Sequence, residues 1–210
     1  MTTRRLFLLG LPLLIAGLAA GRSEAQQISL AEISRYFNEE LVTAEGEFTQ
    51  INPDGTISTG TIYIKRPGRV RFEYNPPEES IVMAAGGSLA IFDPRSNTRP
   101  ERYPLSETPL SIILARNVDL TRARMVTNHT SDGTTTTVTA QDPDHPEYGN
   151  IRLIFTGNPT ELRQWVITDD LGEQTTVILG DLKKGGRIPE SRFNILAELR
   201  RRGFDSFADD

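Results

Sequence analysis

The 210-residue sequence contains no cysteine and only two histidines. Without cysteine, disulfide bonds, thiolate metal sites and a lipid-modified N-terminal cysteine are excluded, so the chain is not itself expected to be a membrane-anchored lipoprotein. The histidines, His129 and His145, stand in polar or turn-rich stretches, and no serine or cysteine nucleophile motif accompanies them. These absences argue against an enzyme.

Positive charge is outnumbered, with 23 lysine and arginine residues against 28 aspartate and glutamate residues and a formal net charge of −5. An acidic chain is a poor binder of nucleic acid by default. The loop Asp142–Glu147 carries carboxylates and a histidine, but Pro143 and Pro146 stiffen it and it lacks an established metal-ligand spacing. We therefore expect no nucleic-acid partner, no metal and no cofactor.

Long apolar runs are missing after the first residues, since no later segment approaches the roughly 20 apolar residues of a membrane span. At the start, Thr3-Arg4-Arg5 precedes an apolar run from Leu6 to Ala20 and the small-x-small pattern Ser23-Glu24-Ala25. This order predicts a cleaved signal peptide of residues 1–25, exported by either the Sec or the twin-arginine route. Export without cysteine predicts a periplasmic mature chain of residues 26–210.

Strand patterns dominate the mature chain. From Glu45 to Pro104 and again from Ala123 to Lys183, short segments rich in β-branched and aromatic residues alternate with turn residues. No helical crossover separates consecutive strands, which favours an antiparallel meander. Because the chain shows no internal repeat and no linker, we predict one domain with a broad, twisted sheet that tends to curl.

Two helices are predicted to lie on this sheet. The first, within Ser29–Thr43, has apolar residues at helical spacing, Ser29 as its cap and Glu32 to complete a capping box. The second, within Thr108–Arg116, is short and almost wholly apolar, with Thr108 as its cap. Such a segment suits a lid or plug better than a solvated helix.

Residues 61–74 predict a β-hairpin with one apolar face. Val70, Phe72 and Tyr74 alternate with charged residues, which is the period of a half-buried strand, and Arg66-Pro67-Gly68-Arg69 forms the tip. A sheet that curls around two apolar helices leaves a concave apolar space, which either packs tightly or holds a ligand. Periodicity alone leaves both readings open.

Five blocks carry a family resemblance: Gly46-Glu47-Phe48-Thr49-Gln50, Tyr63-Ile64-Lys65-Arg66-Pro67-Gly68, Glu79-Ser80-Ile81-Val82, Phe92-Asp93-Pro94, and Thr108-Pro109 through Ile113-Leu114-Ala115-Arg116-Asn117. In order and spacing, from about residue 30 to about residue 180, the chain resembles the LolA family of periplasmic outer-membrane lipoprotein carriers. The tail from about Leu196, which includes a possible helix at Asn194–Arg202, departs from the usual family ending.

The resemblance implies a mainly β fold, an unclosed antiparallel β-barrel or half-barrel covered by short helices that act as a lid. It implies that Arg66 closes the lid by bonding to backbone groups of the helices. It also implies an apolar lipid-binding cavity, for which the candidate residues are Phe48, Ile62, Ile64, Val70, Phe72, Tyr74, Val82, Phe92, Leu110, Ile113, Leu114 and Trp165.

The implied function is a monomeric carrier. It would receive acylated lipoproteins from an inner-membrane lipoprotein-releasing ABC transporter and deliver them to an outer-membrane receptor or membrane acceptor. A second hypothesis is a periplasmic lipid-sensing or protein-interaction module of the same fold without transport activity. Under that hypothesis Arg66 is a solvated turn residue and the aromatic residues are ordinary core.

Overall fold

The computed structural model describes residues 27–96, 98–122 and 124–204, and the predicted signal peptide, residues 1–25, lies outside them. The strands are β1 (Thr43–Ile51), β2 (Ile57–Lys65), β3 (Arg69–Tyr74), β4 (Ile81–Ala85), β5 (Ser88–Phe92), β6 (Glu101–Pro104), β7 (Val126–Ser131), β8 (Thr135–Gln141), β9 (Asn150–Thr156), β10 (Glu161–Thr168), β11 (Gln174–Leu179) and β12 (Lys183–Lys184). The helices are α1 (Leu30–Arg35), the π-helical turn η1 (Tyr36–Glu40), α2 (Leu110–Leu114) and α3 (Ile195–Arg201), with 3₁₀ turns η2 (Leu105–Glu107), η3 (Pro146–Tyr148) and η4 (Glu190–Phe193).

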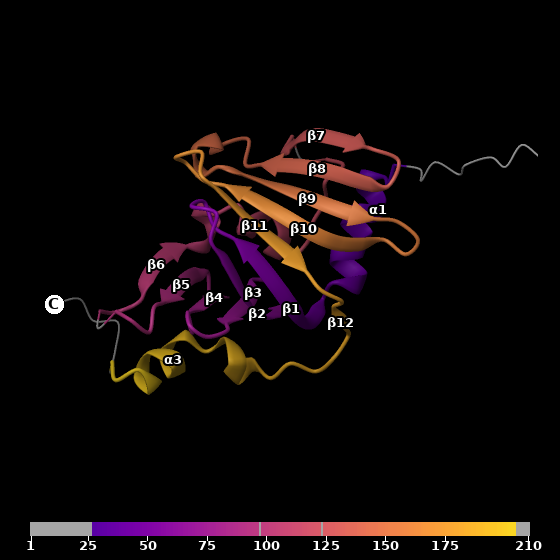
Figure 1. Cartoon of the computed structure of the whole chain (residues 1–210). Helices are drawn as coiled ribbons and strands as arrows, with labels where there is room; N and C mark the ends of the chain where they lie inside the picture. The colour runs from indigo at the N-terminus through magenta and orange to yellow at the C-terminus, as the bar shows by residue number, and fades with distance from the viewer. Residues whose placement is uncertain (1–26, 97, 123, 205–210) are drawn as a thin grey trace, which may run out of the picture.

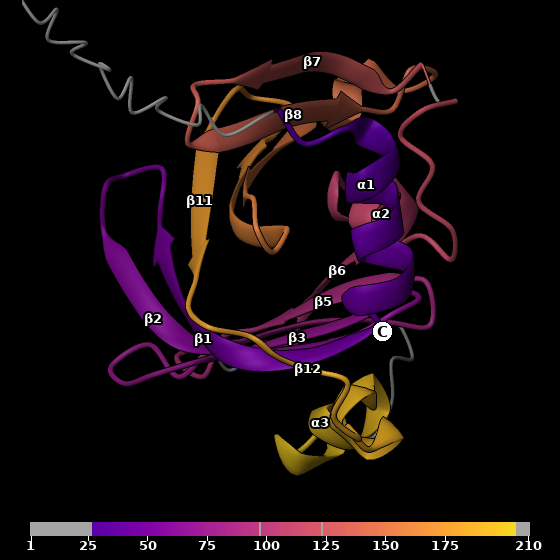
Figure 2. The ribbon, with the colours of Figure 1, turned by 90° about the vertical axis from the view of Figure 1, so that its right-hand side faces the viewer.

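The strands form one antiparallel sheet in the order β6-β5-β4-β3-β2-β1-β11-β10-β9-β8-β7, and β12 pairs with β1. The sheet curls strongly (Figure 1). Its edge strands β6 and β7 do not pair with each other, and α1 and α2 lie across the open side (Figure 2). These features confirm the unclosed antiparallel barrel with short helices.

Alternation along the strands gives the sheet an inner and an outer face. In β3, Val70 and Phe72 join the main core cluster, whereas Arg71 between them reaches Glu198 of α3 on the other face. The inner face packs against α1, η1 and α2. The apolar space predicted between sheet and helices is therefore present as one continuous cluster of side chains.

The first helix confirms part of its predicted cap. The Ser29 hydroxyl accepts a hydrogen bond from the Glu32 amide at 3.1 Å. The reciprocal half of the capping box is wrong, because the Glu32 carboxylate accepts a hydrogen bond from the Thr160 hydroxyl. The helix also ends at Glu40, where the turn into β1 begins. The Glu32 side chain thus fastens α1 to the turn between β9 and β10.

The second helix and the last strand also differ from prediction. Thr108 does not cap α2, since its hydroxyl donates to the Leu105 carbonyl at 2.8 Å and Pro109 takes the cap position. The strand predicted over Gln174–Lys183 is divided into β11 and β12, and at the break the Gly180 amide donates to the Glu47 carbonyl at 2.9 Å.

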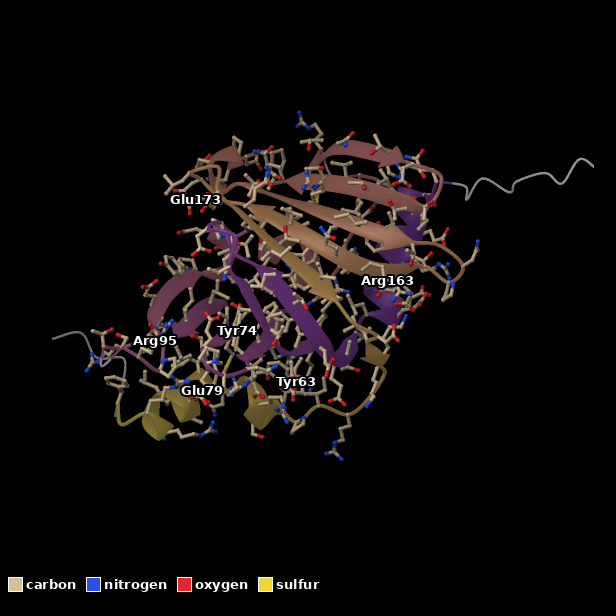
Figure 3. The ribbon with its side chains drawn as sticks, in the orientation of Figure 1. Tyr63, Tyr74, Glu79, Arg95, Arg163 and Glu173 are labelled. Atoms are coloured by element: carbon tan, nitrogen blue, oxygen red, sulfur yellow. The ribbon has the colours of Figure 1, made fainter. Side chains whose placement is uncertain are left out.

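The C-terminal tail covers part of the outer face. The Asn194 side chain caps α3 by accepting from the Ala197 amide at 2.9 Å. The Arg192 guanidinium lies 3.9 Å from the ring centroid of Tyr63, which points outward from β2 (Figure 3). Beneath α3 lies a second apolar cluster of Ile81, Met83, Ala90, Phe92, Ile195 and Leu199. No helix in the described part of the chain is long and apolar enough to cross a membrane.

Candidate functional site

The candidate site is the apolar space between the inner face of the sheet and the helices α1, η1 and α2, which we call the lid. A small cavity there is lined by Phe37, Leu41, Ile64, Arg66, Val70, Leu110, Ile113, Leu114 and Trp165. Its volume is about 10 Å³, close to the minimum that one water molecule requires. An acyl chain does not fit a space of this size, because the side chains of the sheet and of the helices fill it.

Arg66 is the only charged residue of that lining, and it is 7% exposed. It lies at the tip between β2 and β3. Nη1 donates a hydrogen bond to the Phe37 carbonyl of η1, and Nη2 donates to the Ala115 carbonyl at the end of α2 at 2.6 Å. The guanidinium thus joins the two helical parts of the lid to each other and to the sheet.

The electrostatics of Arg66 make this contact weaker than an ion pair. Burial lowers the pKa of Arg66 to about 10, because the charged form loses hydration. Among the described residues its Nε has no hydrogen-bond partner, and the guanidinium carbon lies 5.6 Å from the centroid of the Phe37 ring. The acceptors are neutral carbonyls, which offset only part of the cost of burying the charge.

Aromatic side chains form the floor of the site. Phe48 packs edge-to-face against Phe72 and Tyr74, with ring centroids 5.2 and 5.1 Å apart, and Phe72 packs against Trp165 at 6.2 Å. Tyr74 donates its hydroxyl to the Gln50 side chain at 2.7 Å. These rings belong to the main core cluster or pack against it, and the Tyr74 hydroxyl is paired with Gln50, so this part of the inner face offers mainly apolar contact.

The structure brings together all but one of the predicted cavity residues. The main core cluster, with the side chains packed on it, contains Phe48, Ile62, Ile64, Val70, Phe72, Tyr74, Val82, Leu110, Ile113, Leu114 and Trp165. Phe92 lies in the second cluster, under α3. In β5, Leu89 faces inward, so Phe92, an odd number of residues away, faces outward. The assignment of Phe92 to the cavity is therefore corrected.

Several lining residues were missed from the sequence. Phe37 and Leu41 belong to the apolar stripe of the first predicted helix, which marks them as buried but does not show that they face the lid space. Asn38 was also missed. Its side chain pairs with the backbone of Val118, and nothing in the sequence indicates that contact over 80 residues.

The chain is similar to known carriers over most of its length. The model of the family described as outer membrane lipoprotein carrier protein LolA matches residues 39–196. An outer-membrane lipoprotein carrier protein of Chromohalobacter salexigens is 26% identical over 192 residues, covering 88% of this chain and 87% of that protein. One from Methylibium petroleiphilum is 31% identical over 110 residues, covering 49% of this chain and 53% of that protein. A solved LolA superfamily protein from Nitrosomonas europaea has a TM-score of 0.45 and 13% identity, covering 79% of this chain and 96% of that one.

Proposed function

The chain belongs to the LolA family of outer membrane lipoprotein carrier proteins, and from this premise we propose that it holds the acyl chains of lipoproteins between its sheet and its lid. Each CH₂ group moved out of water contributes about 0.8 kcal/mol, so a lipoprotein needs an apolar escort to leave a membrane. The aromatic floor supplies that apolar surface. The lid must open first, because the closed cavity measures about 10 Å³.

The observation that carries the proposal is the buried fork of Arg66 across the lid. Its bonds to the Phe37 and Ala115 carbonyls stabilise the empty, closed protein. Binding of an acyl chain must offset the breaking of this fork, which lowers the net affinity for cargo. A carrier needs this property, since cargo held too tightly is not released to an acceptor.

We propose a route for the cargo that follows from this balance. The mature chain, residues 26–210, acts as a monomer in the periplasm after removal of residues 1–25. An inner-membrane ABC transporter supplies the energy that places the acyl chains under the open lid. An outer-membrane receptor or membrane acceptor then takes them. The divergent tail from about Leu196 remains part of the single domain, since α3 packs on the sheet.

A transfer assay tests the role of Arg66. The wild-type chain and the variant Arg66→Leu are mixed with inner membranes that carry a labelled lipoprotein and then with outer membranes. We expect Arg66→Leu to take up lipoprotein but to release it at least about tenfold more slowly, since two hydrogen bonds to a charged group are lost from the closed state. Arg69→Leu is the matched control, because Arg69 on the same tip pairs with Glu190 outside the lid. Release from Arg66→Leu at the wild-type rate would contradict the proposal.

The second candidate is an interaction or lipid-sensing module without transport. The tight packing of the closed site favours it, because a cavity of about 10 Å³ is also what an ordinary core shows. Native mass spectrometry of the protein from a periplasmic extract separates the two. A bound acylated species supports the carrier. An empty protein that also takes up no added lipoprotein supports the module.

A further inference from the structure

Apart from Arg66, which bonds to both, the two helical parts of the lid attach to different parts of the sheet. The first lid segment, residues 28–40, is fastened to the second half of the sheet and to β12. The Ile28 amide donates to the Thr136 hydroxyl of β8 at 2.9 Å, and the Lys184 ammonium donates to Glu40 at 3.2 Å. The Glu32 carboxylate accepts from Thr160. These contacts hold the segment at both of its ends.

The second lid segment, residues 110–120, attaches to the first half of the sheet. The Gly68 amide donates to the Leu114 carbonyl at 2.8 Å, and Arg66 donates to the Ala115 carbonyl. Both donors lie on the tip between β2 and β3. The residues after α2, up to β7, include Val118 and Leu120, whose side chains are 3% and 1% exposed.

Asn38 joins the two lid segments. Its side-chain amide donates to the Val118 carbonyl at 2.8 Å, and its side-chain oxygen accepts from the Val118 amide at 3.0 Å. Nearby, the Leu120 amide donates to the Ser34 hydroxyl at 3.0 Å. The Asn38 side chain therefore pairs with both the amide and the carbonyl of Val118, a buried residue of the second segment. In the described chain these two backbone groups have no other hydrogen-bond partner.

We propose that Asn38 is a second latch of the lid, and that opening moves the second lid segment away from the first, which stays on the sheet. This inference rests on the proposed carrier function and specifies how the same lid is regulated. Moving the first segment would break its contacts with Thr136, Thr160 and Lys184, two of which involve charged groups. Moving the second segment breaks one hydrogen bond to a charged group, from Arg66, and neutral ones to Gly68, Asn38 and Ser34. The neutral Asn38 pair is the weaker barrier, since hydrogen bonds to charged groups contribute more.

Hydrogen exchange of the full chain, without cargo, tests the latch. We compare wild type with Asn38→Leu, which keeps the side-chain size. The control is Asn75→Leu, because the side-chain amide of Asn75 donates to the Thr59 hydroxyl at an exposed site. The readout is the Gly68 amide and the peptide 108–116, whose amides Asn38 does not contact. We expect these to exchange at least about tenfold faster in Asn38→Leu, because two neutral hydrogen bonds are lost, with residues 28–40 unchanged.

Three results would overturn the inference: equal gains in both lid segments, a gain in every strand, or no gain at all. Ser34→Ala gives a second variant, for which we expect a smaller gain in the same peptide. Arg66→Leu in the same experiment separates this inference from the proposed function. A gain with Asn38→Leu but not with Arg66→Leu supports the Asn38 latch and contradicts the role given to Arg66. The reverse pattern supports Arg66 and overturns the Asn38 latch.

Discussion

Replacing Glu198 tests whether the tail is an integral part of the fold. Glu198 in α3 is 3% exposed and accepts hydrogen bonds from Arg71 at 3.3 Å, Arg201 at 2.7 Å and Arg202 at 3.1 Å. Arg71 is also buried, at 6% exposed. In Glu198→Ala the Arg71 guanidinium stays buried while its carboxylate on α3 is lost.

The expected loss of stability follows from the remaining partners. Breaking a buried ion pair by removing one partner costs about 3–5 kcal/mol. Arg71 keeps the Glu73 carboxylate at 2.6 Å, and Arg201 and Arg202 can turn to water. We therefore expect Glu198→Ala to lower the free energy of unfolding by about 3 kcal/mol, the lower end of that range.

Urea unfolding measures this change. Trp165, the single tryptophan, lies in the main core and reports on global unfolding through its fluorescence. Trypsin cleavage after Arg200 or Arg201 reports on release of α3. The matched control is Glu190→Ala, because Glu190 also joins the tail to two cations, Lys65 and Arg69, but is exposed, so we expect a much smaller loss. Equal losses for the two variants, or a Glu198→Ala midpoint equal to wild type without faster cleavage, would refute the reasoning.

Two further predictions concern the inner face. Burial raises the pKa of Tyr74, so the tyrosine stays protonated in the folded chain at a pH above about 10, where it ionises in the unfolded chain. The contribution of this shift to stability is therefore full below pH about 10 and is lost as the pH rises toward the folded pKa. Urea unfolding between pH 8 and about 11 should show this decline. Tyr74→Phe should make it shallower without abolishing it, since burial also raises the pKa of Tyr36, and should cost about 1 kcal/mol at pH 7 through the lost bond to Gln50. An unchanged slope would contradict the assignment. Phe72→Ala and Phe92→Ala should each lower the free energy of unfolding by about 3–5 kcal/mol. Only Phe72→Ala should reduce lipoprotein uptake, since Phe92 lies in the second cluster, outside the lid space. Equal uptake by the two variants would contradict the division of faces.

The sequence predicts the fold well where local chemistry decides it. The alternation of Val70 and Phe72 with charged residues, and the turn residues around Pro67, specify a hairpin whatever lies beyond it. The Ser29 side chain caps its helix through a bond to the amide three positions on, so this cap is predicted from the sequence.

Features that depend on distant partners are not readable in this way. Glu198 in a tail helix with three following arginines has the pattern of a solvated surface, and only Arg71, 127 residues earlier, makes it a buried carboxylate. Phe92 has the same local pattern as the cavity residues, and its face depends on the register with β4. Asn38 reads as an exposed helix position until Val118 is placed beside it.

The hairpin of β2 and β3 is held on both sides, which supports our proposal that the lid moves and the hairpin stays in place. Inside, Val70 and Phe72 pack in the main core, and outside, Arg71 pairs with Glu198. An arginine can hold the lid closed only if its own backbone stays in place. If the hairpin tip moved together with the lid, Arg66 would keep its hydrogen bonds and would not oppose opening. On the proposed carrier function, the outer tail therefore supports Arg66 from the opposite face of the sheet by holding the hairpin through Glu198.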